Sequence, residues 1–600
     1  MAVYRYATKD LSITTAKAFV HAATMTAGTS SDEDTRNTKK SVILYVCIGR
    51  NNDWPSEPTP IMPPDNEQNL HYDTHRRFIG AKKVTPGDIS HVTERHNWIS
   101  GTVYSQYRDT DEDMYDRQFY VVTNEYNVYK CLFNNKGAAS TVKPTGFSTI
   151  PFTTSDGYTW KYMYTISLGE AQKFMTASHI PVKTISSSDG SVESDRQVAV
   201  QNAAVNGAIH VVETVNVGSG YHFIANGVVE SGGKYTVSLF NNPDNPPSPI
   251  DNFYNGSSVY VVSGTGAGQL RRIIDYVGTT KTLTVNTAFA TVCNNDSKVI
   301  ISPTVTVIGD GKGAKAYSLV NTSTGAISNI AVVATGSGYT RASALISSNS
   351  LHGSGATANV VISPAGGHGR DPVRELYADK VMINVQINPK EGVSANGSGY
   401  IPSNTEFRTI SLLRDPVLKV DANNNIIRIE KIANTSNSPS TLRLTSRMTI
   451  SYNQMDGSTP VNSLSIGDTI TNERNRLRAE LGELEFVTEL GPSARKSAAL
   501  ANAVKAANAN IVYLREDETQ SDPSFYTLYI NNVESYSDYA AFTKDDVILK
   551  STSETQIATV EQIKGPEANT FSGEILVTEN LPVVIRDENE IEDIKIILDF

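Results

Sequence analysis

The sequence predicts a mainly β protein with few short helices and with β-rich segments inserted into its core. Short stretches of alternating or continuously apolar residues recur along the 600 residues and are separated by Gly, Pro, Asn and Asp. Charged residues make up 19% of the chain and hydrophobic residues 39%, which is typical of a folded globular protein with somewhat few charges. A chain of this length usually exceeds a single core, so we expect two to four packed units.

The N-terminal region begins with a predicted helix and a predicted buried strand. Apolar residues between Asp10 and Ala23 recur at spacings of three and four, which indicates a short helix with one apolar face. Ser41 to Ile48 is continuously apolar and rich in β-branched residues, as in a buried strand. Prolines dominate residues 51–69, so we expect an irregular, stiff segment there.

Three further strands are expected at residues 118–123, 127–133 and 159–166. In the last of these, large side chains alternate with smaller or polar ones. Because alternate residues of a strand point to opposite faces, we expect one face to carry Trp160, Tyr162, Tyr164 and Ile166.

Beyond Val205 the chain becomes rich in Gly, Ser, Thr, Asn and Val, and its short alternating runs predict an all-β insertion. The expected strands are 208–217, 258–263, 281–286, 304–308, 327–333 and 356–362. A weak repeat lies within this region, because a strand followed by Gly-Ser-Gly-Tyr occurs at residues 208–221 and again at 326–339. Two related β units are therefore plausible.

A strand beginning at Phe407 is followed by a mixed region with one strongly helical stretch. Its alanine content and Pro492 and Ser493 at its start predict a helix near residues 493–509. The chain then returns to strands at 574–578 and 594–598.

These patterns give five predicted segments. Residues 1–200 form the N-terminal part of a core, 201–365 an inserted β-rich domain, and 366–416 a return to the core. Residues 417–565 form a second, mixed α/β insertion, and 566–600 the C-terminal core strands.

Charge and cysteine content exclude several classes of function. The net charge of −11 and the absence of Lys and Arg clusters argue against binding to nucleic acid. Three widely spaced cysteines, without paired CxxC spacing, predict free thiols in a reducing compartment. No leader-like segment or apolar run of about 20 residues is present, so we expect no membrane insertion.

Two glycine-rich loops are candidate anion sites. Ser263 to Gln269 has the glycine density of a phosphate-binding loop, but a strand pattern follows it and no GK[ST] is present, so we interpret it as a β-turn between hairpin strands. Ala365 to Pro372 could form an anion nest or an oxyanion hole, but no nucleophile lies nearby in the sequence. We interpret it as a flexible junction where the chain re-enters the core.

Histidines and acidic residues provide two candidate metal sites. His71 and His75 could share a helix face as ligands, but HExxH is absent and the surrounding prolines make a helix doubtful. We therefore interpret all four histidines, His71, His75, His91 and His96, as solvated or interface residues in preference to metal ligands. The acidic run Asp109 to Asp116 lacks the glycine and distal glutamate of an EF-hand, so we expect a solvated loop with a minor chance of a bound cation. The sequence therefore predicts no catalytic, cofactor or metal-binding residues.

Several short segments, in order along the chain, carry a resemblance to a known family. They are Ile48-Gly49-Arg50 with Trp54-Pro55, Asn97-Trp98, Asn127 to Leu132, Asp156 to Tyr162, Phe407 to Ser411 with Asp415-Pro416, Ser572 to Ile575 with Asn580-Leu581-Pro582, and the last strand ending at Phe600. Together they resemble the baseplate wedge subunits encoded by gene eight of T4-type phages. The match covers roughly residues 1–190, 370–416 and 565–600 and leaves out both insertions.

The resemblance implies a β-sandwich core, a homodimer and a place in the virion, in the tail baseplate, beside other wedge proteins and possibly fibre proteins. Such a late structural protein would be assembled in the host cytoplasm, would not be an enzyme, and would transmit the rearrangement that triggers sheath contraction. The 28 tyrosines suit interfaces that tolerate water. Two alternatives stay open, a receptor- or carbohydrate-binding tail component with exposed Tyr221 and Tyr339, and a glycosidase acting on the host envelope.

Overall fold

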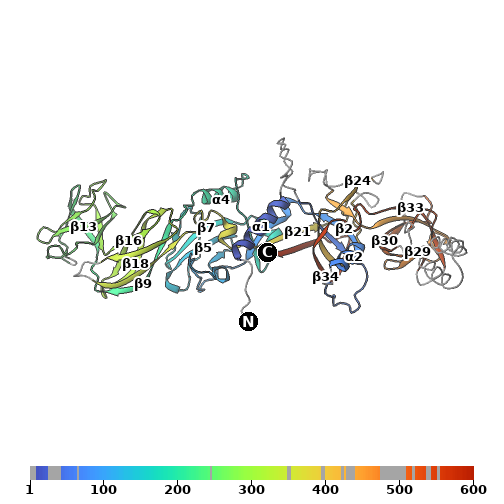
Figure 1. Ribbon diagram of the computed structural model, residues 1–600, viewed down its shortest axis with the longest axis horizontal. Helices are drawn as coiled ribbons and strands as arrows, with labels where there is room; N and C mark the ends of the chain where they lie inside the picture. Colours follow the sequence, from blue (N-terminus) through green and yellow to red (C-terminus); the bar gives the residue numbers. More distant parts are fainter. Residues whose placement is uncertain are drawn as a thin grey trace, which may run out of the picture. The chain divides into compact units, whose positions relative to one another are not determined.

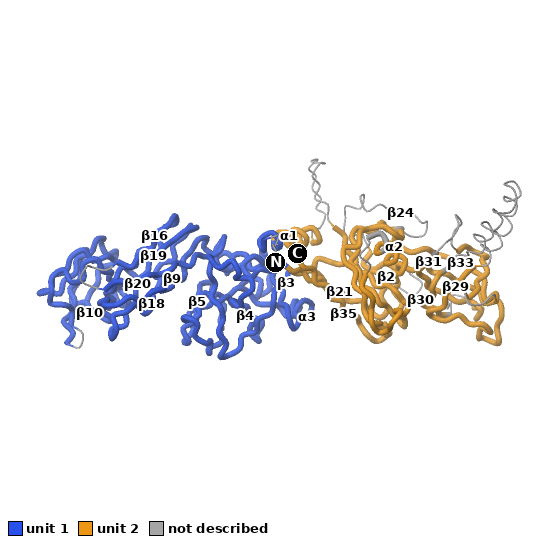
Figure 2. Tube along the Cα trace, turned by 60° about the horizontal axis from the view of Figure 1, so that its bottom comes forward, with its two compact units in different colours: residues 1–13, 91–379 blue, residues 14–90, 380–600 orange. Residues whose placement is uncertain are grey.

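Strands dominate the protein. The computed structural model describes residues 8–24, 42–63, 67–243, 246–347, 353–392, 399–420, 425–427, 439–472, 508–516, 521–534, 542–550 and 555–600. Strands account for 47% and helices for 11%, which confirms the predicted mainly β fold with few short helices (Figure 1). The chain divides into unit 1, residues 1–13 and 91–379, and unit 2, residues 14–90 and 380–600 (Figure 2).

The core of unit 1 is an antiparallel sheet of order β4-β5-β7-β6, accompanied by the pair β3 and β8. Both faces of its central strands are covered, because Val128 and Leu132 of β5 join one apolar cluster and Tyr129 and Cys131 join another. Its elements are β3 (Ile89–Glu94), η2 (Met114–Asp116), β4 (Tyr120–Val122), β5 (Asn127–Asn134), η3 (Asn135–Gly137), β6 (Phe152–Thr153), β7 (Tyr158–Thr165), α3 (Leu168–Phe174), β8 (His179–Val182), α4 (Val192–Asn202) and α5 (Pro372–Glu375).

A six-stranded antiparallel sheet, which we call the roll, follows this core in unit 1. Its order is β18-β17-β16-β19-β20-β9, and its outer strands β9 and β18 approach each other so that the sheet nearly closes around its own apolar cluster. The strands are β9 (Ile209–Ser219), β16 (Thr304–Gly309), β17 (Lys312–Asn321), β18 (Ala326–Ser337), β19 (Ala342–Ser347) and β20 (Ser354–Ile362).

The first barrel is a closed antiparallel barrel of order β10-β11-β14-β13-β12-β15, also in unit 1. Valine, isoleucine and tyrosine side chains fill its interior. Its strands are β10 (Ile224–Gly232), β11 (Thr236–Leu239), β12 (Ser258–Ser263), β13 (Leu270–Val277), β14 (Thr282–Val285) and β15 (Lys298–Ser302).

Unit 2 contains a β-sandwich, as expected for the core. A sheet of order β25-β2-β1-β22-β34 packs one face against the pair β21 and β35, so that Val46 and Leu412 meet Val381 and Ile383 in one apolar cluster. The elements are β1 (Leu44–Gly49), α2 (Glu67–Arg77), β2 (Phe78–Lys83), η1 (Pro86–Asp88), β21 (Lys380–Ile387), β22 (Thr405–Arg414), β25 (Thr441–Arg443), β34 (Glu574–Arg586) and β35 (Glu592–Asp599).

The second barrel belongs to unit 2 and is a closed antiparallel barrel of order β26-β31-β30-β29-β32-β33. Its strands and the neighbouring hairpins are β23 (Leu418–Val420), β24 (Asn425–Ile427), β26 (Ser446–Tyr452), β27 (Met455–Asp456), β28 (Thr459–Pro460), β29 (Thr469–Asn472), β30 (Asn508–Glu516), β31 (Phe525–Glu534), β32 (Val547–Lys550) and β33 (Gln556–Lys564). The predicted helix near 493–509 lies outside the described residues up to 507, and Asn508 already belongs to β30.

The roll and both barrels share one way of joining the chain. The roll begins and ends on a strand pair in which Ile209 faces Ile362. The first barrel begins and ends where Ile224 faces Ile301, and the second where Arg447 faces Lys564. The first and last strands of each module are therefore paired, so the chain enters and leaves the module at neighbouring positions.

Two expectations about local structure are wrong. A helix does carry His71 and His75, because α2 begins at Glu67, after the last of the prolines in this segment. The rings of β7 do not share one face either. The pairing with β5 shifts after Tyr162, so Trp160 and Tyr162 join one cluster and Tyr164 joins the cluster on the other face.

The N-terminal helix and the turns agree with expectation. Helix α1 (Lys9–Thr24) buries Ile13 and Ala16. The segment 51–63 contains neither helix nor strand, as its prolines predict. In the part of the chain that the structure describes, no helix is long and apolar enough to cross a membrane.

Candidate functional site

Two lysines lie in the middle of otherwise apolar strands in the core of unit 1. Lys130 of β5 and Lys161 of β7 face each other in the antiparallel pair, and their exposed fractions are 0% and 2%. The ammonium group of Lys130 lies 3.8 Å from the centre of the Tyr107 ring. Because an unpaired buried charge is costly, this arrangement requires a counterion.

Glu375 supplies that counterion from helix α5. Its Oε2 atom lies 3.0 Å from Lys130 Nζ, and its Oε1 atom accepts hydrogen bonds from the backbone N–H groups of Gly369 at 2.7 Å and Asp371 at 3.3 Å. Burial opposes ionisation of this carboxyl group, but Lys130 and His368 outweigh burial and lower the pKa of Glu375 to about 2. Burial lowers the pKa of Lys130, and Glu375 opposes that change.

The glycine-rich loop 365–372 is therefore not an open anion nest. Gly366, Gly367 and Gly369 have positive φ angles of 88°, 98° and 90°, which lets their backbone donors converge as the sequence suggested. The donor of Gly369 is already used by the carboxylate of Glu375. The loop closes tightly over β7, because a Cβ atom at Gly369 would lie 3.0 Å from Lys161 Cε.

Two histidines extend the cluster. His368, at 4% exposure, lies with its ring 5.4 Å from that of His210, and the Nδ1 atoms of both rings are buried without a hydrogen-bond partner. Burial and the charge of Lys130 lower the pKa of His368 to about 3, and burial together with Lys161 and Lys130 lowers that of His210 to about 4. Both imidazoles are consequently neutral near pH 7.

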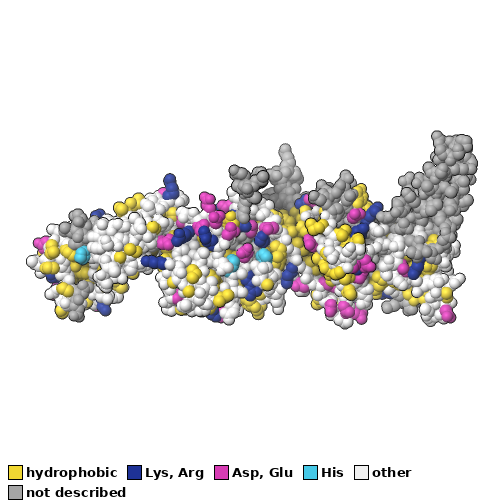
Figure 3. Space-filling model, turned by 90° about the horizontal axis from the view of Figure 1, so that it is seen from below, with side chains coloured by type: hydrophobic (Ala, Val, Ile, Leu, Met, Phe, Trp, Pro, Cys, Tyr) yellow, Lys and Arg dark blue, Asp and Glu magenta, His cyan; other side chains and the backbone are white. Residues whose placement is uncertain are grey.

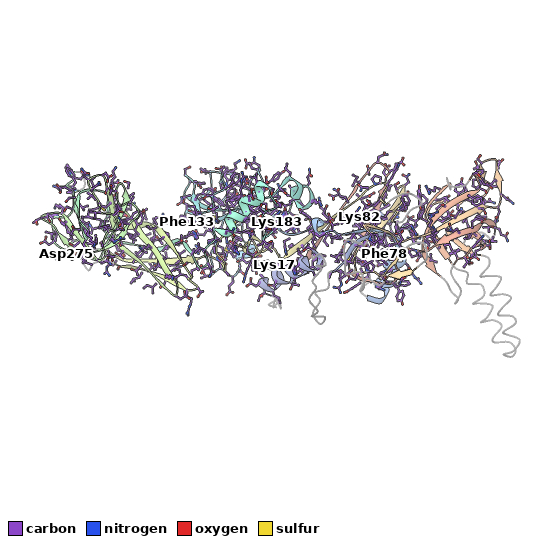
Figure 4. The ribbon with its side chains drawn as sticks, turned by 90° about the horizontal axis from the view of Figure 1, so that it is seen from above. Lys17, Phe78, Lys82, Phe133, Lys183 and Asp275 are labelled. Atoms are coloured by element: carbon purple, nitrogen blue, oxygen red, sulfur yellow. The ribbon has the colours of Figure 1, made fainter. Side chains whose placement is uncertain are left out.

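A pocket of about 540 Å³ opens beside this cluster, between the core of unit 1 and the roll. Its lining includes Lys161, His210 and His368 together with apolar side chains of both modules, among them Phe133, Val211 and Val332. Phe133 stands at the end of β5 that faces the roll (Figure 4). On the face seen in Figure 3, cationic and acidic side chains are mixed over this core, whereas the roll and the first barrel show mainly uncharged ones.

Unit 2 contains a second cluster of charges, at the sandwich. Arg408 of β22 is 3% exposed, and its guanidinium group binds three carboxylates, with Nη2 2.7 Å from Asp53 and Nη1 2.6 Å from Glu406. Its Nε atom binds Glu57. Because these three acids come from two distant segments of the sequence, Arg408 ties the loop after β1 to β22.

Trp54 connects the same loop to β34. Its indole Nε1–H donates a hydrogen bond to the carbonyl of Leu581 at 2.7 Å, and the guanidinium group of Arg50 lies 3.8 Å from its ring centre. Asn580 donates to the carbonyl of Ile61 at 2.8 Å. The segments that carry the family resemblance in unit 2 are therefore joined directly to one another.

The loop Ser263 to Gln269 is the hairpin turn that its sequence predicted, because β12 and β13 on either side of it are an antiparallel pair. The backbone N–H of Thr265 donates to Asp296 at 2.9 Å, so an internal carboxylate again takes a loop donor. The acidic run Asp109 to Asp116 is largely exposed, and Asp111 forms an ion pair with Arg117 at 2.8 Å, which agrees with a solvated loop.

The histidine rings of α2 lie 4.3 Å apart between their centres. Burial and the neighbouring His71 lower the pKa of His75 to about 4, and His71 Nε2 lies 3.2 Å from the carbonyl of Phe571. His91 is buried and His96 packs on Tyr120, so the four histidines do not form one site. Across the described ranges, no group of three or more His, Cys, Asp or Glu side chains is placed to hold a metal ion.

The tyrosines of the repeated Gly-Ser-Gly-Tyr turns are buried, not exposed. Tyr221 and Tyr339 are each 5% exposed, and their hydroxyl groups accept hydrogen bonds from the backbone N–H groups of Ala356 and Ala314. The preceding glycines have matching φ angles, 61° and 74° in the first turn and 61° and 75° in the second. The two turns therefore have the same local structure, and both copies belong to the roll, where β9 and β18 are its outer strands.

Sequence reasoning did not identify Lys130, Lys161, Glu375, His210 and His368 as a cluster. A signal was present, since each lysine interrupts an apolar strand between large or apolar neighbours, in Tyr129-Lys130-Cys131 and Trp160-Lys161-Tyr162. Their proximity depends on strand register and on a return of the chain after the roll. Comparison of the chain with models of protein families gives no match, and comparison with curated proteins gives no significant match.

Proposed function

We propose that this chain is a structural subunit of the baseplate wedge of a contractile-tailed phage, acting as a homodimer that holds wedge proteins together. In this proposal it also transmits the rearrangement that triggers sheath contraction, through rigid-body motion at subunit interfaces. The chain would act in the virion and would have no catalytic role.

One observation carries the proposal. Segments that resemble the T4-type wedge subunits are direct neighbours within each unit, and in unit 2 they come from parts of the chain that are hundreds of residues apart. In unit 1, Asn127 to Leu132 pairs with residues of Asp156 to Tyr162. In unit 2, β22 lies between β1 and β34 and pairs with both. The resemblance therefore follows a connected framework, as expected if that framework is what the family shares.

The packing of this framework suits a part that transmits force. The strands β5 and β7 are covered on both faces, and buried charged groups such as Lys130 and Arg408 tie distant segments together. Close-packed interiors have low compressibility and transmit strain. These properties favour a scaffold over a flexible binding module.

The rival interpretation as a carbohydrate-binding component has lost part of its original support. It was motivated by the glycine-rich β repeats and by exposed tyrosines in their turns, and the second of these grounds is removed because both rings are buried.

The proposal is tested on the full chain by light scattering after size exclusion and by co-expression with the other wedge proteins of the same phage. We expect a stable dimer that elutes with those proteins, and we expect the chain in purified tails by mass spectrometry. A stable monomer that does not bind the wedge proteins and is absent from purified tails would contradict the proposal.

A further inference from the structure

The buried cluster in unit 1 contains more positive charge than its carboxylate can balance. Glu375 is engaged by Lys130 through Oε2 and by two backbone donors through Oε1. The ion pairs of the described residues include none for Lys161, whose ammonium group donates to the carbonyl oxygen of Thr149. Within hydrogen-bond distance Lys161 thus has a neutral acceptor, and the charge of Glu375, already paired with Lys130, acts on it from farther away. A buried cation in this position is costly without further compensation.

Lys161 also lines the 540 Å³ pocket, so the missing negative charge can be supplied from outside. His210 and His368 line the same pocket, and each is a neutral imidazole that can donate one N–H. The Nδ1 atoms of both rings are buried, and that of His368 lies 3.8 Å from Glu375 Oε2, so a donor to a ligand would have to be Nε2. The described lining of the cavity contains Lys161 and no Asp or Glu, which favours an oxyanion and disfavours a cation.

The remaining walls define the body of the ligand. Phe133, Ile150, Val211 and Val332 are apolar and come from both the core and the roll. A volume of about 540 Å³ lies within the range of roughly 300–1,000 Å³ that small-molecule pockets occupy. An inorganic ion alone would leave these apolar walls wet, whereas a compact organic anion would cover them.

We infer that this pocket binds a small organic anion whose single oxyanion group, a carboxylate or a phosphate, is held by Lys161 and whose apolar body lies between β7 and the roll. This site is independent of the proposed role in a baseplate. Its position between two modules means that a bound anion would also hold the roll against the core.

Binding is measured on the full chain by isothermal titration calorimetry with benzoate and phenyl phosphate, and with benzyl alcohol as the uncharged match. We expect saturable binding of at least one anion and much weaker binding of the alcohol. The anion with the lower dissociation constant shows whether the pocket prefers a carboxylate or a phosphate. Equal binding of alcohol and anions, or no saturable binding of either anion, would overturn the inference.

Lys161→Met removes the charge and keeps the aliphatic stem, and we expect it to weaken anion binding about 10- to 100-fold. Lys315→Met is the matched control, because Lys315 is exposed on β17 of the same unit. Ile150→Asp provides a second variant at a residue that is 67% exposed, so it places a repelling charge at the pocket without disturbing the core. Unchanged binding in both Lys161→Met and Ile150→Asp would refute the assignment.

The pH dependence gives a further readout. Burial lowers the pKa of Lys161 to about 8, and Glu375 opposes that change. The other titratable groups of the cluster are Lys130, Tyr107, His210 and His368. Burial raises the pKa of Tyr107 and lowers those of His210 and His368 to about 4 and about 3, so none of these three groups changes charge between pH 6 and 8. The affinity for benzoate, which is ionised throughout this range, should therefore stay constant from about pH 6 to 7 and fall above pH 8, and it should lose this dependence in Lys161→Met.

Discussion

Replacing Glu375 by Gln removes the carboxylate that pairs with Lys130 while keeping the side-chain volume. The ammonium group 3.0 Å away then stays buried at 0% exposure beside a second buried lysine. Breaking one partner of a buried ion pair costs about 3–5 kcal/mol, and we expect the upper part of that range because two lysines share one carboxylate. Since 1.4 kcal/mol corresponds to a factor of ten, the local opening equilibrium should rise by a factor on the order of a thousand.

Hydrogen exchange measured by mass spectrometry on peptides from β5 and β7 reports this local opening, and it avoids treating a chain of several modules as a two-state system. Glu230→Gln is the matched control, because Glu230 is exposed on β10 of the same unit. Lys130→Met combined with Glu375→Gln should recover part of the loss, since no unpaired charge of this pair remains. If Glu375→Gln exchanges no faster than Glu230→Gln, the pair is not the counterion system that we describe.

The pH dependence of this effect has a definite sign. The folded-state pKa of Glu375, about 2, lies below its ordinary value of 4.5, so the carboxylate stabilises the fold fully above about pH 4.5. That stabilisation is lost as the pH falls from about 4.5 to about 2. Protection of β5 and β7 in the native chain should therefore drop across this window. In Glu375→Gln the drop should be shallower, because only the contribution of His210 and His368, whose pKa values are also lowered, remains.

Three further outcomes follow from the packing. Gly207→Ala should destabilise the roll by about 2–5 kcal/mol, because the added Cβ atom would lie 2.3 Å from the backbone N of Tyr339 and the φ angle is +62°. Gly101→Ala is the control and should cost only about 1–2 kcal/mol, because the space around Gly101 is open. Equal protease resistance of the two variants would contradict this prediction. Arg408→Met should lower the free energy of local opening of the loop after β1, measured by hydrogen exchange, by about 1–3 kcal/mol. The cost stays moderate because the carboxylates that lose Arg408 can be hydrated. Arg414→Met, which breaks an ion pair at the surface, is the control and should cost at most about 1 kcal/mol. The thiols of Cys47, Cys131 and Cys293 are buried, and burial raises their pKa values. A thiol reagent should therefore label none of them in the native chain and all of them in denaturant. Rapid labelling of the native chain would contradict this, because it would show that the strands around these residues open readily.

Local patterns in the sequence predicted most strands of the core and of the roll, because alternation and glycine turns are short-range signals. The strand at 258–263 and its glycine-rich turn are examples. Tyr164 shows the limit, since its face depends on a register shift between β5 and β7 that leaves no mark in β7 alone. Helix α2 was obscured by the prolines that precede it.

The charged cluster could not be predicted for a different reason. Lys130 and Glu375 are 245 residues apart, and they meet only because the chain returns to the core after the roll. The glycines of the loop at 365–372 did indicate converging backbone donors, but the anion that uses the Gly369 donor is part of the same chain. Composition and spacing carry no information about which internal carboxylate fills such a loop.

The paired entry and exit strands of the roll and the two barrels have a consequence for how such a gene can change. The roll is bounded by Ile209 and Ile362, which face each other on two neighbouring strands. Recombination at these two positions can remove or exchange the module, because the two chain ends left in the core are close enough to be joined by a short turn. The first barrel, bounded by Ile224 and Ile301, is nested inside the roll in the same manner, so the cassettes can be added in succession. Descendants of one ancestral framework could thus differ greatly in length and surface while every core strand keeps its neighbours.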